Sequence, residues 1–150
     1  DESVSSGEQI GLVGMSGGVK GSTLHFEVRY GENLFSKVIN PELWLAPLPD
    51  EDGQALGALA GRVVDAQGNY LKVENIVLER LAGPGMPAMD QLYLKTYAEK
   101  RLMGISPIGE TFGVGSLPAG EYQITFLLNG VHQRVVKIEP GKLTLVTFQL

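Results

Sequence analysis

A period of two in the apolar positions marks the first strong element of the chain. Within residues 23–30 every second side chain is apolar, at Leu24, Phe26, Val28 and Tyr30. The positions between them are polar, at Thr23, His25, Glu27 and Arg29. Successive side chains of a strand point to opposite faces, so this pattern predicts a β-strand with one apolar and one polar face. Because an apolar face needs a cover, we expect it to pack against the rest of the chain or against a second copy in a homodimer.

Further apolar runs follow, each bounded by glycine, proline or another turn residue. They occupy residues 59–64, 74–81, 91–98, 110–114, 121–128, 131–138 and 143–150. Asn129-Gly130, between two of these runs, is a strong signal for a tight β-hairpin. Many short strands at this spacing predict an all-β fold, with an antiparallel β-sandwich over residues 56–150.

The segment between the alternating strand and the sandwich has a different character. Asn40-Pro41 combines a capping side chain with a ring that suits the first helical position, so we expect a single helical turn there. Residues 46–55 contain prolines and the acidic run Asp50-Glu51-Asp52, a composition typical of a linker. The chain is therefore expected to divide into a first domain at residues 1–45, a linker at 46–55 and a sandwich domain at 56–150.

Composition narrows the range of functions. The chain has a net charge of −5 and no cluster of Lys and Arg to displace counterions from phosphates, so no nucleic-acid partner is expected. It has no cysteine, which excludes disulfides and zinc–thiolate sites. No apolar stretch reaches the length of a membrane span, so none is expected.

The glycine-rich turn at residues 14–18 and the alternating strand together carry a resemblance. Gly14-Met15-Ser16-Gly17-Gly18 is followed by Leu24-His25-Phe26-Glu27-Val28-Arg29, and then by Gly31 and Asn40-Pro41. In this order they resemble the end of the lysostaphin-type (LytM-like) zinc endopeptidases, which cut peptidoglycan in the bacterial envelope. The resemblance covers residues 9–45 and implies that this segment is the C-terminal part of such a domain, with part of its β-sheet.

The resemblance also implies roles for two residues. The family's closing motif is His-x-His, in which the second His binds zinc and the first acts beside the metal-bound water. His25 matches the zinc ligand, whereas Thr23 stands at the catalytic His position, and a Thr hydroxyl is too weak a base to accept a proton near neutral pH. A catalytic zinc needs three protein ligands, and the family's other two lie upstream of the matched segment. We therefore expect zinc in the intact family enzyme, a vestigial or partial ligand at His25, and no zinc bound by this chain.

Glu27 and Arg29 share the polar face with His25 and have two interpretations. They either orient His25 as neighbours of a metal ligand, or form a same-face ion pair that contributes little at a surface. His25 itself is either an inherited ligand or a polar groove residue. The other histidine, His132, lies in the predicted sandwich and is interpreted as part of a strand face.

A second resemblance covers most of the predicted sandwich. Residues 61–68 followed by residues 117–122 resemble the carboxypeptidase-regulatory-like (transthyretin-like) sandwich, a module appended to secreted or surface proteins for binding, spacing or stabilisation. Within it, Tyr93 and Tyr97 share one side of a predicted strand and form either a carbohydrate platform or a half-buried surface. We expect Trp44, outside the sandwich, to close the end of the first domain.

Two functions follow from these features. The first is the C-terminal fragment of a cell-envelope zinc metallopeptidase-like protein of the peptidoglycan endopeptidase class, inactive as this chain alone. The alternative is a non-catalytic envelope module for adhesion, wall binding or spacing, which keeps a degenerate peptidase remnant. Both place the chain in an extracytoplasmic location, with peptidoglycan or a cell-wall peptide as the candidate partner.

Overall fold

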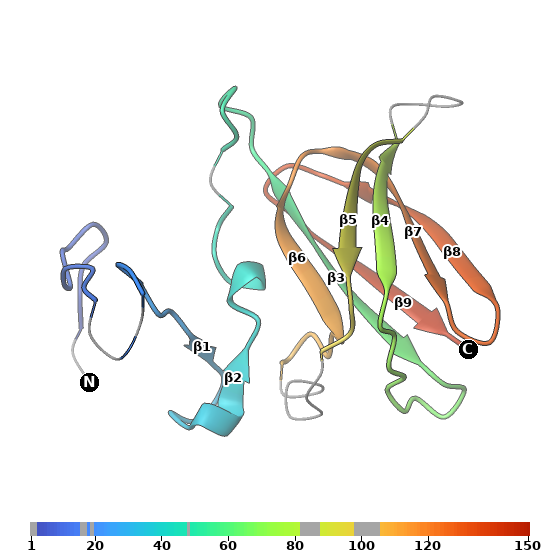
Figure 1. Cartoon of the computed structure of the whole chain (residues 1–150), viewed down its shortest axis with the longest axis horizontal. Coiled ribbons are helices and arrows are strands. Elements are labelled where there is room, and N and C mark those ends of the chain that lie inside the picture. The colour runs from blue at the N-terminus through green and yellow to red at the C-terminus, as the bar shows by residue number, and fades with distance from the viewer. Residues whose placement is uncertain (1–2, 16–17, 19, 48, 82–87, 98–105) are drawn as a thin grey trace.

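The computed structural model describes residues 3–15, 18, 20–47, 49–81, 88–97 and 106–150. Its regular elements are strands and single 3₁₀ turns, and no α-helix occurs in this described part. The longer strands form the two sheets of a β-sandwich, and two short strands before it form a separate pair (Figure 1). The all-β fold and the sandwich predicted from the sequence are therefore confirmed.

The larger sheet has the strand order β5-β4-β7-β8 and is antiparallel throughout. Its strands are β4 at Ile76–Leu81, β5 at Ala88–Leu94, β7 at Gly120–Leu127 and β8 at Val131–Ile138. The predicted hairpin joins β7 to β8, where Asn129 and Gly130 have φ angles of 54° and 144°. Positive φ at both positions is what a tight hairpin turn needs, which explains why an Asn-Gly pair stands there.

The smaller sheet has the order β6-β3-β9. Its strands are β3 at Gly57–Val64, β6 at Phe112–Leu117 and β9 at Leu143–Gln149. β3 pairs with β6 in the antiparallel direction but with β9 in parallel. This parallel pair departs from the predicted antiparallel arrangement. It arises because the chain leaves β8 in the larger sheet and crosses to the smaller one, instead of turning back within one sheet.

The hydrophobic core lies between the two sheets. Its largest fully buried side chains come from both sheets and include Leu59, Ile76, Leu78, Phe112, Leu117, Ile124, Phe126 and Ile138. The ring of Phe112 lies against Gly61, where an added Cβ would come within 2.1 Å of the ring. A glycine in β3 therefore makes room for the phenyl group that fills the centre of the core.

The first segment forms much less strand than the sequence predicts. Within residues 23–30 only Val28–Arg29 (β1) is a strand, and it pairs with Val38–Ile39 (β2), which follows the 3₁₀ turn Phe35–Lys37 (η1). Earlier in the segment, Thr23 forms a single bridge with Gly14. A strand needs a hydrogen-bonded neighbour along its whole length, and β2 supplies one for only two residues.

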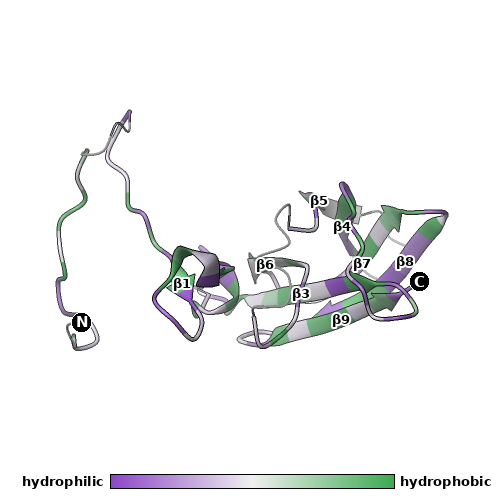
Figure 2. Ribbon diagram, turned by 90° about the horizontal axis from the view of Figure 1, so that it is seen from below, coloured by the Kyte–Doolittle hydropathy of each residue, from purple (hydrophilic) through white to green (hydrophobic). Residues whose placement is uncertain are grey.

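The apolar face of this segment does not pack against the sandwich, so that part of the prediction is wrong. Leu24, Phe26 and Tyr30 are 74%, 52% and 47% exposed, and Val28 is half-buried. The residues before β1 run as an extended trace away from the two sheets (Figure 2). Packing against a second copy of the chain stays a prediction.

The end of the first segment does contact the sandwich. The predicted turn is the 3₁₀ helix η2 at Pro41–Leu43, and the Asn40 side chain caps it by accepting a hydrogen bond from the Glu42 amide at 3.0 Å. η2 lies over β6 and β3 on the outer face of the smaller sheet. Trp44, expected to close the end of the first domain, is 43% exposed, and Leu43 supplies the packing instead.

The described residues test the remaining sequence predictions only in part. The prolines and acidic residues of 46–55 precede β3, and within them the Asp50 side chain accepts hydrogen bonds from the amides of Asp52 and Gln54. Residues 83–87, which are rich in glycine and proline, residue 98 and residues 16–17 of the glycine-rich turn lie outside the described residues. The strand predicted at 91–98 ends at Leu94, and residues 95–97 form no strand. The division into two domains stays a prediction.

Candidate functional site

The structure brings together the three polar residues singled out on the alternating strand. Because alternate residues of an extended chain project to the same side, His25, Glu27 and Arg29 meet at the surface. His25 Nε2 and Glu27 Oε1 are 2.7 Å apart. Arg29 donates from Nε and Nη2 to Glu27 Oε2 at 2.9 and 2.6 Å, and from Nη1 to Asn33 Oδ1 at 2.8 Å. These four side chains line one open depression, which we call the His25 cluster.

Electrostatics in the His25 cluster favour a charged carboxylate. The pKa of Glu27 is lowered from its ordinary value, first by the hydrogen bond with His25 and then by the hydrogen bonds from Arg29. Each of these donors stabilises the ionised form of the acid. The Glu27 side chain is 16% exposed, whereas the His25 ring is 79% exposed. The Glu27 carboxylate is therefore largely shielded from solvent, whereas the His25 imidazole that contacts it is exposed.

This geometry presents one oriented imidazole nitrogen. With Nε2 hydrogen-bonded to Glu27, Nδ1 of His25 is left without a partner among the described residues. A carboxylate that fixes one ring nitrogen while the other faces outward is the usual arrangement behind a metal-bound His. An ion pair at a surface would use the same contacts. The orienting role of Glu27 and Arg29 therefore stays a prediction.

The described residues do not supply the ligands of a catalytic zinc centre. Three protein ligands are needed, and nowhere in the described ranges do three His, Cys, Asp or Glu side chains gather. Thr23 donates its hydroxyl to the Gly21 carbonyl at 3.1 Å and offers no imidazole. The other histidine, His132, belongs to β8, where its ring stacks on Phe126 with 5.1 Å between centroids. The donors that the described residues bring together therefore do not fit the zinc site that the resemblance implies.

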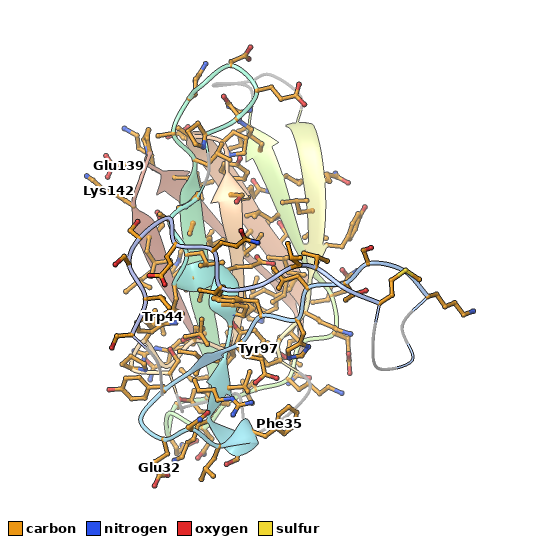
Figure 3. All side chains as sticks on the ribbon, turned by 90° about the vertical axis from the view of Figure 1, so that its left-hand side faces the viewer. Glu32, Phe35, Trp44, Tyr97, Glu139 and Lys142 are labelled. Atoms are coloured by element: carbon orange, nitrogen blue, oxygen red, sulfur yellow. The ribbon has the colours of Figure 1, made fainter. Side chains whose placement is uncertain are left out.

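A second polar cluster lies at the junction between η2 and the sandwich. Asn40 Nδ2 donates to the Tyr97 hydroxyl at 3.1 Å and to the Gly113 carbonyl at 3.4 Å. Glu42 Oε2 accepts a hydrogen bond from the Gly115 amide at 2.9 Å. Figure 3 shows this side of the molecule, with Tyr97 and Trp44 labelled. These bonds fix the end of the first segment to the smaller sheet.

Sequence reasoning did not identify this junction, although β6 carries a signal for it. Gly113 and Gly115 alternate along one face of the strand, and glycine in a strand often marks the close approach of another backbone. An added Cβ at Gly113 would lie 2.9 Å from Leu43 Cδ1, and one at Gly115 would lie 2.9 Å from the Glu42 carbonyl oxygen. The two glycines are the places where η2 docks.

Below the junction lies a buried carboxyl group. Glu110 is 2% exposed, and its carboxyl oxygens make no hydrogen bond of good geometry with the described residues. The Tyr97 hydroxyl nevertheless lies close enough to the Glu110 carboxyl for the two groups to interact electrostatically. Burial raises the pKa of the Tyr97 phenol, the hydrogen bond from Asn40 opposes this, and the carboxyl groups of Glu110 and Glu42 add to the rise. Tyr97 thus remains a neutral hydroxyl that links η2 to the sandwich.

The two tyrosines predicted to share a face are separated. Tyr97 is half-buried under η2, whereas Tyr93 is 67% exposed on β5. Strand β5 ends at Leu94, and the alternation that would keep both rings on one side ends with it. A platform made of both rings is therefore not formed.

The sequence matches no family model and no curated protein. Among solved structures, the Bacillus anthracis TIE protein is 11% identical, with a TM-score of 0.45 over 63% of this chain and 16% of that one. The minor pilin GBS52 of Streptococcus agalactiae is 17% identical, with a TM-score of 0.42 over 64% of this chain and 44% of that one. An (S)-allantoin synthase is 18% identical, with a TM-score of 0.43 over 65% of this chain and 41% of that one.

This chain spans less than half the length of each of these three proteins. At TM-scores below 0.5 the likeness says nothing about binding or activity. The resemblance to lysostaphin-type peptidases stays a prediction. In the part of the chain that the structure describes, no helix is long and apolar enough to cross a membrane.

Proposed function

We propose that this chain is a non-catalytic module of an extracytoplasmic envelope protein. In this proposal the β-sandwich carries the function, and the segment before it is a peptidase-like remnant. The observation that carries the proposal is the composition of the His25 cluster. It offers one imidazole nitrogen, and its only carboxylate is engaged by His25 and Arg29. A site with one available ligand does not hold a catalytic zinc or activate its water.

The junction supports a role in holding or spacing. η2 is fixed to the outer face of the smaller sheet by the bonds of Asn40 and Glu42, and Leu43 fills the space over Gly113. Several hydrogen bonds and a packed side chain restrict the angle at which the first segment leaves the sandwich. The sandwich therefore acts as a fixed support for the first segment.

A second candidate rests on the orientation of His25. Glu27 holds the ring so that Nδ1 faces solvent, as in a histidine that awaits a metal. In this candidate the segment at residues 9–45 completes the zinc site of a peptidoglycan endopeptidase whose other ligands come from outside this sequence. Thr23 at the catalytic position would still leave the reaction without its imidazole base.

Zinc titration by calorimetry tests whether this chain alone forms a tight zinc site. For the chain alone we expect binding no tighter than about micromolar, corresponding to about −8 kcal/mol, and no difference between the wild type and His25→Ala. A stoichiometric site of nanomolar affinity that His25→Ala removes would overturn the non-catalytic proposal. Thr23→His, made in a protein that also supplies the ligands outside this sequence, is the gain-of-function variant that separates the two candidates. If it produces zinc-dependent cleavage of peptidoglycan, the second candidate holds instead.

A further inference from the structure

The outer face of the larger sheet carries an ordered array of mostly polar side chains with a single charged group among them, Glu79. Strand register places one row of residues across all four strands, namely Tyr93, Val77, Thr125 and Gln133. The next row along the strands contains Gln91, Glu79, Gln123 and Val135. Side chains with a period of two share a face, and the alternate residues of β4 and β7 are the buried ones of the core. These two rows therefore face away from the core.

Hydrogen bonds between the side chains hold this array in place. The Tyr93 hydroxyl donates to Gln91 Oε1 at 3.0 Å, and Gln91 Nε2 donates to Glu79 Oε1. On the neighbouring strands, the Thr125 hydroxyl accepts from Gln123 Nε2 at 3.3 Å and from Gln133 Nε2 at 3.5 Å. Side chains fixed before a ligand arrives lose little conformational entropy when it binds, which favours recognition.

The array combines a largely polar centre with apolar groups at its two sides. Tyr93 is 67% exposed, and its hydrogen bond to Gln91 ties the ring to the sheet. At the β7–β8 end, Leu127, Val131 and Val135 are 74%, 63% and 51% exposed. A ligand on this face would meet an aromatic ring at one side, amide and hydroxyl groups in the centre, and aliphatic groups at the other side.

We propose that this face binds a neutral oligosaccharide. A sugar ring has an apolar face of C–H groups and an edge of hydroxyls that both donate and accept hydrogen bonds. Tyrosine offers the matching apolar surface, and the amides of glutamine both donate and accept. This inference rests on the proposed function, since it names the ligand class of the non-catalytic sandwich.

Charge and shape favour this ligand over others. The two rows contain Glu79 and no Lys or Arg, so they offer no cation to bind an anionic polymer. The centre of a protein interface is usually made of apolar and aromatic anchors, whereas here the central strands present the polar groups of Glu79, Gln123 and Thr125 beside Val77. Four strands spaced by about 4.8 Å give the rows a width of about 14 Å, which suits a short oligosaccharide.

Binding is tested by following the amide signals of the ¹⁵N-labelled chain in NMR while neutral tetrasaccharides of N-acetylglucosamine and of glucose are added. We expect shifts confined to β4, β5, β7 and β8. Tyr93→Ala should weaken binding about tenfold or more, and Tyr93→Phe should retain most of it because the ring is kept. Tyr30→Ala is the matched control, since Tyr30 is also exposed but lies in the first segment. It should leave the affinity unchanged.

The proposal is overturned if neither sugar shifts these signals at millimolar concentration, or if Tyr93→Ala binds as the wild type does while its core signals show it folded. Failure here is distinguishable from failure of the proposed function. Absence of sugar binding together with absence of zinc-dependent cleavage would leave a non-catalytic sandwich with another ligand. Zinc-dependent cleavage would reject the non-catalytic role whatever the sugar result.

Discussion

At the scale of single residues, Glu110 is the group most at odds with its surroundings. A buried carboxyl that makes no hydrogen bond of good geometry loses its hydrogen bonds to water and gains little in return, and the nearby Tyr97 hydroxyl offsets this loss only in part. We expect Glu110→Leu, which removes the carboxyl and keeps the volume, to raise the free energy of unfolding by about 1–3 kcal/mol. Urea denaturation measures this. Glu110→Gln is the matched control with a smaller gain, because its amide is still polar. A Leu variant less stable than the wild type would show that the carboxyl has a stabilising partner.

The lowered pKa of Glu27 predicts that the ordering of the His25 cluster depends on pH. Its pKa lies below the ordinary 4.5 because His25 and Arg29 donate hydrogen bonds to it. A group whose pKa is lowered by folding contributes stability above its unfolded pKa, and this contribution is lost as the pH falls through the folded value. The ordering of the His25 cluster should therefore persist above about pH 4.5 and be lost well below it.

NMR titration of the Glu27 carboxyl measures this effect. We expect Arg29→Ala to raise the pKa of Glu27, because two of its hydrogen bonds disappear. Asn33→Ala touches only Arg29, so its effect should be smaller. Equal pKa values in the wild type and Arg29→Ala would mean that the ion pair does not form in solution.

At the scale of elements, the docking of η2 depends on two glycines of β6. Gly113→Val places methyl groups where Leu43 now lies, 2.9 Å from an added Cβ. We expect η2 to leave the sheet and the sandwich core to stay folded. Hydrogen exchange should then quicken at residues 38–45 and remain slow in β4 and β7. Leu45→Ala changes an exposed neighbour and should leave exchange unaltered. Unchanged protection of residues 38–45 in Gly113→Val would contradict the docking described here.

Local chemistry explains which elements the sequence predicts well. The Asn129-Gly130 hairpin and the turn capped by Asn40 depend on neighbouring residues only, so their signals can be read directly. The parallel pairing of β3 with β9 joins residues 85 positions apart in the sequence, and strand composition does not encode direction. The strand at residues 23–30 was predicted from a clean alternation, but its existence depends on a partner that the pattern does not supply.

The same reasoning applies to the candidate site. The period of two correctly predicts that His25, Glu27 and Arg29 share a side. It does not predict Asn33, which lies beyond the strand and enters through a turn. The outer rows of the larger sheet were not predicted because they depend on the register of four strands. The sequence pattern predicts Tyr97 beside Tyr93 on one side of a strand, whereas the structure places Gln91 next to Tyr93 on this face.

At the scale of the whole molecule, the two halves of the chain differ in how they bury apolar surface. The sandwich has a continuous core, whereas residues before β1 leave Ile10, Leu12 and Leu24 exposed by 81%, 88% and 74%. An exposed patch of this kind usually marks a surface that another polypeptide covers. Among the described residues the hydrophobic core lies in the sandwich, whereas the His25 cluster lies on the segment that leaves its apolar side chains exposed.

The central claim is that this chain works without catalysing wall hydrolysis, and its most direct test uses purified peptidoglycan. The chain is incubated with peptidoglycan and zinc, and soluble wall fragments released into the supernatant are measured for the wild type and His25→Ala. We predict no release above the level without protein, and no difference between the two. Release that requires zinc and disappears in His25→Ala would contradict the account.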